Sequence, residues 1–318
     1  MLNEQQYAAA TYGELPGRHR PFQSQPLLII AGAGTGKTQT LSHRAAHLIL
    51  NGVDPNRILL LTFSRRAALE MTRRAEAILC EQFHKASSSA PLALPWSGTF
   101  HAIGNRILRH YHGNIGLSEQ FSILDRGDAA DLMDVCRHDL SYSSSAKRFP
   151  RKETCLAIYS RVVNTRLSLE EVLTENFPWC SDWHDELKSL FKHFVKAKQR
   201  TESLDYDDLL LYWQQLMVEP ELAKAVGGRF DHVLVDEYQD TNVLQADVLK
   251  AMKPDGTGVT VVGDDAQSIY SFRAAAIENI LNFPTQYSPS ATVIKLEQNY
   301  RSTQPVLDAA NALIREST

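Results

Sequence analysis

The stretch AGAGTGKT at residues 31–38 decides the fold, together with the apolar run LLII that precedes it at 27–30. It fits the pattern Gly-x-x-x-x-Gly-Lys-Ser/Thr, except that Ala31 stands at the first glycine. A loop of this kind leaves a buried strand and opens a helix, so that backbone N–H groups and the helix N-terminus face a phosphate. The alternative, a tight turn with an exposed lysine, requires neither the strand nor the helix.

Each position of the loop has an expected part in holding a nucleotide. Gly34 and Gly36 let the backbone bend towards the phosphates. Lys37 is expected to reach the β- and γ-phosphates, and Thr38 to ligate Mg²⁺. The residues of the loop that we predict to bind the nucleotide are Ala31, Gly32, Ala33, Gly34, Thr35, Gly36, Lys37, Thr38 and Gln39.

The pattern along the chain extends this local prediction to a whole fold. Short apolar strands alternate with helical patterns near the N-terminus, and the alternation returns in HVLVDE (232–237), VTVVGD (259–264) and ATVIKLE (291–297). Such alternation is typical of βαβ units on a parallel sheet. From about Arg109 to Thr201, strand patterns nearly vanish and apolar residues recur at helical spacing. We therefore predict an α/β sheet domain over 1–108 and 204–288, an all-helical insertion over 109–203, and the start of a second domain over 289–318.

The apolar run HVLV ends in an acidic pair, Asp236 and Glu237. A carboxylate at the end of a strand that neighbours the one leading into the phosphate loop can hold Mg²⁺, and this is the part expected of Asp236. A kinase needs a base for a substrate hydroxyl, whereas a hydrolase needs a base for water. The neighbouring Glu237 suits water activation, so the pair favours hydrolysis over transfer to a small molecule.

Composition limits the class of protein. The 318 residues are 43% hydrophobic and 22% charged, which is ordinary for a globular protein. No apolar run is long enough to cross a membrane, and the start MLNEQQYAAA does not resemble a signal peptide. The four cysteines show no Cys-x-x-Cys spacing, which favours reduced thiols over a metal or disulfide role. We expect a cytoplasmic protein, and its net charge of −4 still allows a local basic groove.

Several motifs occur in one order along the chain: LNEQQYAA, AGAGTGKT, ILLLTFSRRAALEM, GTFHAIGNRIL, DYDDLL, VLVDEYQDTN, VVGDDAQSIYSFRAA and LEQNYRST. Together they resemble the successive motifs of superfamily 1 helicases of the UvrD/Rep/PcrA type. The resemblance runs from residue 2 to about residue 303. It implies a RecA-like P-loop NTPase fold, with helices on both sides of the sheet, and an ATP-dependent DNA helicase that uses ATP and Mg²⁺.

The resemblance assigns parts in ATP binding and hydrolysis to residues outside the loop. Gln6 has the amide to pair with adenine, as its counterpart in the family does. Gln267 corresponds to a glutamine that senses the γ-phosphate. Tyr300 would stack on adenine, and Arg301 would touch the γ-phosphate with a permanent charge. The expected catalytic residues are Glu237, Lys37, Gln267 and Arg301, and the expected metal ligands are Thr38 and Asp236.

The resemblance also assigns a set of DNA contacts. Phe63 and Phe272 correspond to aromatic residues that stack on unpaired bases, a contact that tolerates any sequence. Arg66 and His101 lie in motifs that line the phosphodiester track. Each phenylalanine taken alone also fits core packing, and Tyr270 is either a core residue or a groove contact.

The chain departs from the family at a few positions. Relatives usually have arginine after the Lys-Thr of the loop, where it covers adenine; Gln39 removes this cation–π contact and would weaken nucleotide binding modestly. Ser271 and Ala274 stand where glycines are common. The basic stretches KRFPRK (147–152) and KAKQR (196–200) are either solvated faces or contacts to the DNA backbone.

The sequence stops at Thr318, before the second motor domain that the family uses. Because that domain supplies an arginine finger, we expect this chain to bind ATP and Mg²⁺ but to hydrolyse ATP poorly and to unwind nothing alone. The expected partners are single-stranded DNA, single-strand/duplex junctions and the second motor domain, with 3′→5′ movement and a role in repair or recombination. Alternatives are a non-motor, ATP-gated nucleic-acid-binding module and the helicase part of a helicase–nuclease fusion. The oligomeric state stays open.

Overall fold

The computed structural model of the chain describes residues 2–14, 22–84, 94–142, 148–267 and 275–316. The chain divides into two compact units, each with its own hydrophobic core. We call them the sheet unit and the helical unit. The sheet unit comprises Met1–Ile103, Ala223–Thr241 and Leu249–Thr318, and the helical unit comprises Gly104–Leu222 and Asn242–Val248.

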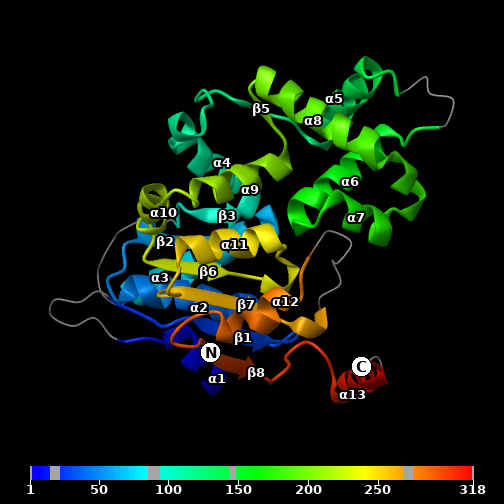
Figure 1. The fold of residues 1–318 in the computed structure, drawn as a ribbon. Helices are drawn as coiled ribbons and strands as arrows, with labels where there is room; N and C mark the ends of the chain where they lie inside the picture. The colour runs from blue at the N-terminus through cyan, green and yellow to red at the C-terminus, as the bar shows by residue number, and fades with distance from the viewer. Residues whose placement is uncertain (1, 15–21, 85–93, 143–147, 268–274, 317–318) are drawn as a thin grey trace. The chain divides into compact units, whose positions relative to one another are not determined.

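A six-stranded parallel sheet forms the centre of the sheet unit (Figure 1). Its strand order is β3-β2-β6-β7-β1-β8, and every neighbouring pair is parallel. The inner strands are apolar runs that are buried almost throughout, as a parallel sheet covered on both faces requires. This confirms the predicted RecA-like parallel α/β sheet. The strands are β1 (Leu27–Ala31), β2 (Ile58–Thr62), β3 (Ser97–Thr99), β6 (His232–Val235), β7 (Val259–Gly263) and β8 (Thr292–Leu296).

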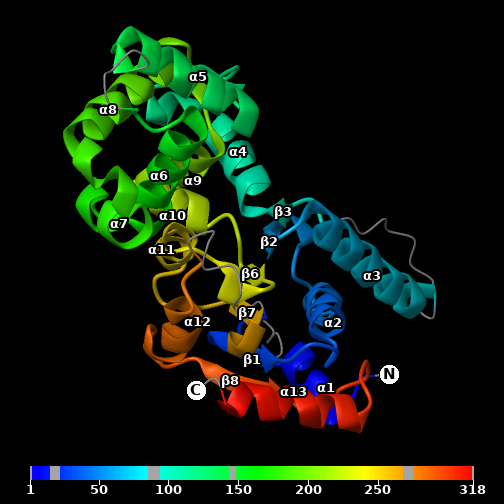
Figure 2. The same ribbon diagram turned by 90° about the vertical axis from the view of Figure 1, so that its right-hand side faces the viewer.

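Helices cover both faces of this sheet. Figure 2 shows α2 (Lys37–Leu50) and α3 (Arg65–His84) on one face and α12 (Glu278–Asn282) on the other. The α2 helix buries Leu41, Ala45 and Leu48, whose spacing places them on one side of the helix. The remaining helices of this unit are α1 (Glu4–Thr11) and α13 (Gln304–Glu316); α4 (Phe100–His110), α10 (Pro220–Gly227) and α11 (Val243–Met252) have residues in both units.

A buried arginine on α2 fixes the position of α1. The guanidinium of Arg44 donates to the carbonyl oxygens of Ala9 and Tyr12, to Ser24 Oγ and, at 2.7 Å, to Thr260 Oγ1 of β7. Burial lowers the pKa of Arg44 to about 10, so it stays charged at neutral pH. Arg44 therefore ties the helix that carries Gln6 to the helix that follows the phosphate loop.

The helical unit has a separate core, in which apolar side chains of α5, α6, α7 and α8 pack together. Three of its helices begin at capping boxes, with Asp125, Ser168 and Asp205 as the N-cap residues. The predicted all-helical insertion also contains a short parallel pair, β4 with β5. Its elements are β4 (Ser122–Ile123), α5 (Arg126–Asp139), α6 (Lys152–Thr165), α7 (Leu169–Asn176), α8 (His184–Arg200), β5 (Ser203–Leu204) and α9 (Tyr206–Leu216).

The boundaries of the units differ from the ranges that the sequence predicts. The helical unit continues to Leu222 and includes 242–248, because α6 holds both segments: Asn164 Nδ2 donates to Asp207 Oδ1, and Asn242 Nδ2 donates to Asn164 Oδ1, each at 2.7 Å. At the C-terminal side, β8 pairs with β1 and so belongs to the sheet. No helix of the described ranges is long and apolar enough to span a membrane.

Candidate active site

The phosphate loop joins β1 to α2 with two glycines in the left-handed region, Gly34 at φ 80° and Gly36 at φ 87°. A Cβ on Gly36 would lie 2.5 Å from Gln6 Nε2, so any other residue would strain the backbone and displace the Gln6 amide. Ala31 is the last residue of β1, where extended backbone accepts any side chain, and this explains why the first glycine of the pattern is dispensable. No side chain caps the start of α2, which leaves its first N–H groups for an anion.

The predicted adenine contact, Gln6, lies directly against the loop. It is 2% exposed, its Nε2 donates to the carbonyl oxygen of Thr35 at 2.8 Å, and its Oε1 accepts from the backbone N–H of Asn3 at 3.0 Å. Gln6 is not among the residues that line the pocket described next. In this structure its amide therefore supports the loop, and an adenine contact stays a prediction.

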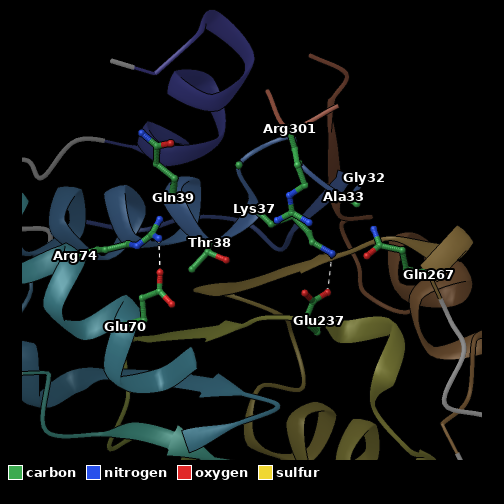
Figure 3. A pocket seen from close by; sticks show the side chains of 12 residues that line it. Gly32, Ala33, Lys37, Thr38, Gln39, Glu70, Arg74, Glu237, Gln267 and Arg301 are labelled. Carbon is green, nitrogen blue, oxygen red and sulfur yellow. Dashed lines mark hydrogen bonds and ion pairs between the residues drawn. The ribbon is translucent and has the colours of Figure 1, made fainter. Parts of the chain in front are cut away.

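A pocket of about 340 Å³ opens over the loop, at the carboxyl ends of the central strands. Figure 3 shows Lys37 and Arg301 directed into the same part of it, with Glu237 facing Lys37. Lys37 Nζ forms an ion pair of 2.7 Å with Glu237 Oε2. The predicted residues that line the pocket are Gly32, Ala33, Gly34, Gly36, Lys37, Thr38, Gln39, Glu237, Gln267 and Arg301; Glu70 and Arg74, paired with each other on α3, complete the lining.

The acidic pair follows β6, which is separated from β1 by β7, so the prediction that the two strands are neighbours is wrong. Asp236 is 5% exposed, and its Oδ1 is buried without a hydrogen-bond partner among the described residues. Burial, and then the charge of Glu237, raise the pKa of Asp236 to about 7, although Lys37 opposes the shift. Glu237 has a left-handed backbone, φ 50°, which a side-chain-bearing residue adopts only under constraint.

A divalent cation fits this arrangement. The unpartnered oxygen of Asp236 is joined by a second one, because Asp240 Oδ1 is also buried and without a partner in the described residues. Burial and Glu237 raise the pKa of Asp240 to about 6. A cluster of carboxylates with one lysine lacks positive charge, and hard oxygen ligands of this kind suit Mg²⁺. Thr38, which lines the pocket, and Asp236, which does not, are the side chains that would hold it.

Sequence reasoning missed Gln239, which connects two predicted residues. Its Nε2 donates to Glu237 Oε2 at 2.9 Å, and its Oε1 accepts from the backbone N–H of Asp264 at 3.1 Å. Asp264 in turn accepts a hydrogen bond from the side chain of Gln267. In the sequence Gln239 is only a polar residue after an acidic pair, and its partner after β7 is distant, so the pattern gave no signal.

A second missed residue, Asn299, holds the segment that carries Tyr300 and Arg301. Its Nδ2 donates to the carbonyl oxygen of Ala33 at 2.5 Å, and its Oδ1 accepts from the backbone N–H groups of Arg301 and Ser302. Tyr300 donates its backbone N–H to Gly34 O at 2.8 Å. The structure thus brings both predicted residues to the loop, with Tyr300 57% exposed beside it.

The candidate DNA contacts that the structure describes lie at the same edge of the sheet, after β2 and β3. These two strands are neighbours, with Thr62 opposite Thr99. Phe63 is 43% exposed, and Arg66 is exposed on the first turn of α3. His101, half-buried on α4, has its pKa lowered to about 4 by burial, so it is neutral at pH 7 and would contact a phosphate without charge. Tyr270 and Phe272 lie outside the described residues.

The basic stretch KAKQR (196–200) is exposed at Lys196, Gln199 and Arg200, which agrees with a solvated face. The prediction is wrong for Lys198, which is 2% exposed. Its Nζ bonds Asp205 Oδ2 at 2.6 Å and Asp208 Oδ2 at 2.5 Å. Although burial opposes it, these carboxylates raise the pKa of Lys198 above its usual value. Lys198 belongs to the interior of the helical unit.

The fold and the pocket define a RecA-like P-loop protein with an inserted helical unit. The sequence pattern of the UvrD/REP helicase N-terminal domain matches residues 18–288, and the chain belongs to this family. It is 38% identical over 296 residues to the ATP-dependent DNA helicase PcrA of Leuconostoc citreum, covering 92% of this chain and 37% of that protein. The proteins of the same name from Staphylococcus epidermidis (strain ATCC 12228 / FDA PCI 1200) and Staphylococcus aureus (strain Mu50 / ATCC 700699) are 37% and 35% identical over 297 residues, with 92% of this chain and 38% of each covered. The chain thus spans less than half the length of these relatives.

Proposed function

We propose that this chain is the ATP-binding part of an ATP-dependent DNA helicase that moves along single-stranded DNA. The observation that carries the proposal is the convergence of Lys37, Thr38, Glu237 and Arg301 on one pocket above an uncapped helix start. These residues come from three distant parts of the sequence. A glycine-rich loop alone supports only phosphate binding, whereas the facing carboxylate supports hydrolysis.

The residues of the pocket divide the chemistry between them. Lys37 and Arg301 would bind the phosphate oxygens, and Glu237 would accept a proton from the attacking water through a carboxylate oxygen. Mg²⁺, held by Thr38 and Asp236, would supply positive charge to the phosphates. In this structure Lys37 instead pairs with Glu237, so a bound phosphate must draw Lys37 away before Glu237 can act as a base. Glu237 can therefore act on water only when a phosphate occupies the site.

The nucleic-acid side of the proposal uses the other half of the same sheet edge. Phe63 would stack on an unpaired base, while Arg66 and His101 would contact the backbone. From the family resemblance we infer 3′→5′ movement, action at single-strand/duplex junctions in the cytoplasm, and a role in repair or recombination. A second motor domain would supply the arginine finger.

Two binding measurements test the proposal on this chain. We expect a fluorescent ATP analogue to bind in the presence of Mg²⁺, and Lys37→Met to weaken its binding by at least about tenfold, as loss of a charged hydrogen bond to phosphate does. The affinity for a single-stranded oligonucleotide should change when a non-hydrolysable ATP analogue is added. Failure of nucleotide binding, or equal binding by Lys37→Met, would contradict the proposal.

The same preparation separates the alternatives. Slow hydrolysis that disappears in Glu237→Gln supports a motor, because the substitution removes the base and keeps the size of the side chain. Coupled ATP and DNA binding with no difference in hydrolysis between the wild-type chain and Glu237→Gln favours a non-motor, ATP-gated nucleic-acid-binding module. Tailed duplexes with 3′ or 5′ single strands, offered to the chain together with a second motor domain, test the direction of movement.

A further inference from the structure

Gln239 acts on the nucleotide site indirectly, through hydrogen bonds to other residues. It follows Glu237 in the short helix Tyr238–Asp240, is 1% exposed, and does not line the pocket. A buried side-chain amide must satisfy both of its ends. In Gln239 the amide nitrogen donates to Glu237, and the amide oxygen accepts from the backbone N–H of Asp264.

The direction of its hydrogen bonds is fixed by its partners. The carboxylate of Glu237 can only accept, and the backbone N–H of Asp264 can only donate. The amide therefore presents Nε2 to Glu237 and Oε1 to Asp264, with no second orientation. Gly263 makes this approach possible, because a Cβ at that position would lie 2.6 Å from Gln239 Oε1.

Gln239 and Lys37 bond the same oxygen of Glu237. Lys37 Nζ lies 2.7 Å and Gln239 Nε2 lies 2.9 Å from Oε2. When Lys37 moves to a phosphate, Gln239 stays bonded to Glu237. The Glu237 carboxylate therefore keeps its position, and its other oxygen, Oε1, can accept a hydrogen bond from water. Without Gln239, Glu237 would lose both partners of Oε2 at the moment when it has to act.

We propose that Gln239 is a positioning residue that holds the base Glu237 and joins it, through Asp264, to the phosphate-facing Gln267. The proposal rests on the proposed hydrolysis of ATP at this site. Gln267 lines the pocket and donates to the Asp264 side chain, while the Asp264 backbone donates to Gln239. A change at Gln267 on phosphate binding is thereby transmitted to the residue that orients Glu237.

Two substitutions separate hydrogen bonding from packing. Gln239→Met keeps the length of the side chain and removes both hydrogen bonds. Gln239→Glu keeps an acceptor for the Asp264 N–H but sets a second carboxylate against Glu237. Gln245→Met is the matched control, because Gln245 Oε1 also accepts a backbone N–H, that of Asn242, away from the pocket.

The measurement is single-turnover hydrolysis of γ-labelled ATP with the chain in excess and a saturating single-stranded oligonucleotide. Glu237→Gln gives the background rate. Because positioned base catalysis contributes about 10²–10⁴-fold, we expect Gln239→Met to lower the rate by about 10-fold or more, and Gln239→Glu by at least as much. The dissociation constant of a non-hydrolysable ATP analogue should stay within about threefold, since Gln239 is not among the residues that line the pocket. Gln245→Met should lower the melting temperature without lowering the rate.

A double substitution tests the connection to Gln267. If both residues act on Glu237 through one path, Gln239→Met combined with Gln267→Ala should be no slower than the slower single variant. Rates that fall by the product of the two single effects overturn the connection. A Gln239→Met rate equal to the wild-type rate, or a loss that matches weaker nucleotide binding, overturns the positioning role. A wild-type chain no faster than Glu237→Gln refutes the proposed hydrolysis instead, and with it any base to position.

Discussion

Each unit of the molecule contains a buried lysine paired with carboxylates, and the two pairs differ in what they leave unsatisfied. In the helical unit, Lys198 is surrounded by Asp205, Asp208 and Tyr159, and its Nζ lies 4.5 Å from the centre of the Phe194 ring. In the sheet unit, Lys37 has one carboxylate partner, Glu237, whose side chain is 32% exposed. Near Lys37 lie two buried carboxylate oxygens without partners in the described residues.

The difference shows how a structural charge pair can be told from a site that is prepared for a ligand. Among the described residues, no buried polar atom of the Lys198 cluster is without a hydrogen-bond partner, so nothing in that cluster requires another molecule. The Lys37 cluster combines an exchangeable ion pair, an uncapped helix start and the strained backbone of Glu237. Its missing charge and missing hydrogen bonds are those that Mg²⁺ and phosphate would supply.

The largest expected effect is that of removing Lys198. Lys198→Met leaves two carboxylates buried without a cation, and breaking such a pair typically destabilises by about 3–5 kcal/mol. Lys37→Met should destabilise by less than about 1 kcal/mol, because Glu237 can hydrate when it loses its partner. Urea unfolding followed by tryptophan fluorescence suits the comparison, since Trp96 reports on the sheet unit and Trp179, Trp183 and Trp213 report on the helical unit.

Lys196→Met is the control for Lys198→Met, because Lys196 is exposed on the same helix. It should unfold at nearly the wild-type urea concentration. Adding Asp208→Asn to Lys198→Met removes one of the stranded charges and should restore part of the lost stability. If Lys37→Met and Lys198→Met lower the free energy of unfolding equally, the distinction between the two lysine clusters is wrong.

The next substitution, Asp236→Asn, is expected to stabilise the chain, by an amount that depends on pH. The pKa of Asp236 is about 7 in the folded chain, raised from 3.8 by burial and by Glu237. The unfolded chain therefore binds fewer protons between these values, and wild-type stability falls as the pH rises from about 4 to about 7. Asp236→Asn removes this loss. Its unfolding free energy should therefore exceed that of the wild-type chain by an amount that grows from about pH 4 and reaches about 4 kcal/mol at pH 8.

Denaturant unfolding at pH 5 and pH 8 checks this prediction. Asp308→Asn is the control, because the exposed Asp308 side chain accepts a hydrogen bond from the neutral Gln304; it should change stability equally at both values. Millimolar Mg²⁺ at pH 8 should stabilise the wild-type chain but not Asp236→Asn. An advantage of Asp236→Asn that is the same at pH 5 and pH 8 would show that Asp236 titrates normally.

The features that the sequence predicts are those with a local signal. The apolar runs, the glycines of the loop and the acidic pair after HVLV each follow from neighbouring residues. Gln239 and Asn299 could not be found in this way, because the atoms that they bond, such as the Asp264 N–H and Ala33 O, come from distant segments. Their chemistry depends on the strand order, which the local pattern does not contain.

Lys198 is a different kind of error, because its burial had a signal. Leu190, Phe194 and Lys198 follow one another at intervals of four residues, which places the lysine on the apolar side of α8. Asp205 and Asp208 follow shortly after, at the start of α9. Helical spacing together with this acidic partner pair outweighs the basic composition of KAKQR.

A smaller effect tests how tightly the loop is built. Gly36 and Gly52 share φ 87°, but a Cβ on Gly52 meets nothing within 4 Å, whereas one on Gly36 lies 2.5 Å from Gln6 Nε2. Alanine in the left-handed region costs about 1–2 kcal/mol at either position. Gly36→Ala should cost about 1 kcal/mol more, because the bond from Gln6 to Thr35 must break. Thermal unfolding compares the two variants, and equal melting temperatures would show that Gln6 moves freely.

The smallest effect concerns the one loop position that departs from the family. Gln39 lines the pocket and carries no charge, so an adenine held there lacks a cation on that side. Gln39→Arg should lower the dissociation constant of an ATP analogue by about two- to fivefold, the range of an exposed cation–π contact. Gln39→Lys serves as the control, because it adds the same charge without a planar guanidinium and should gain less. If arginine and lysine gain equally, and the gain vanishes in high salt, the added charge acts on the phosphates rather than on the base. In that case the affinity of the Lys37 pocket for ATP would be limited by a shortage of positive charge and not by its fit to adenine. The same shortage leaves the carboxylate oxygens near Lys37 without partners among the described residues.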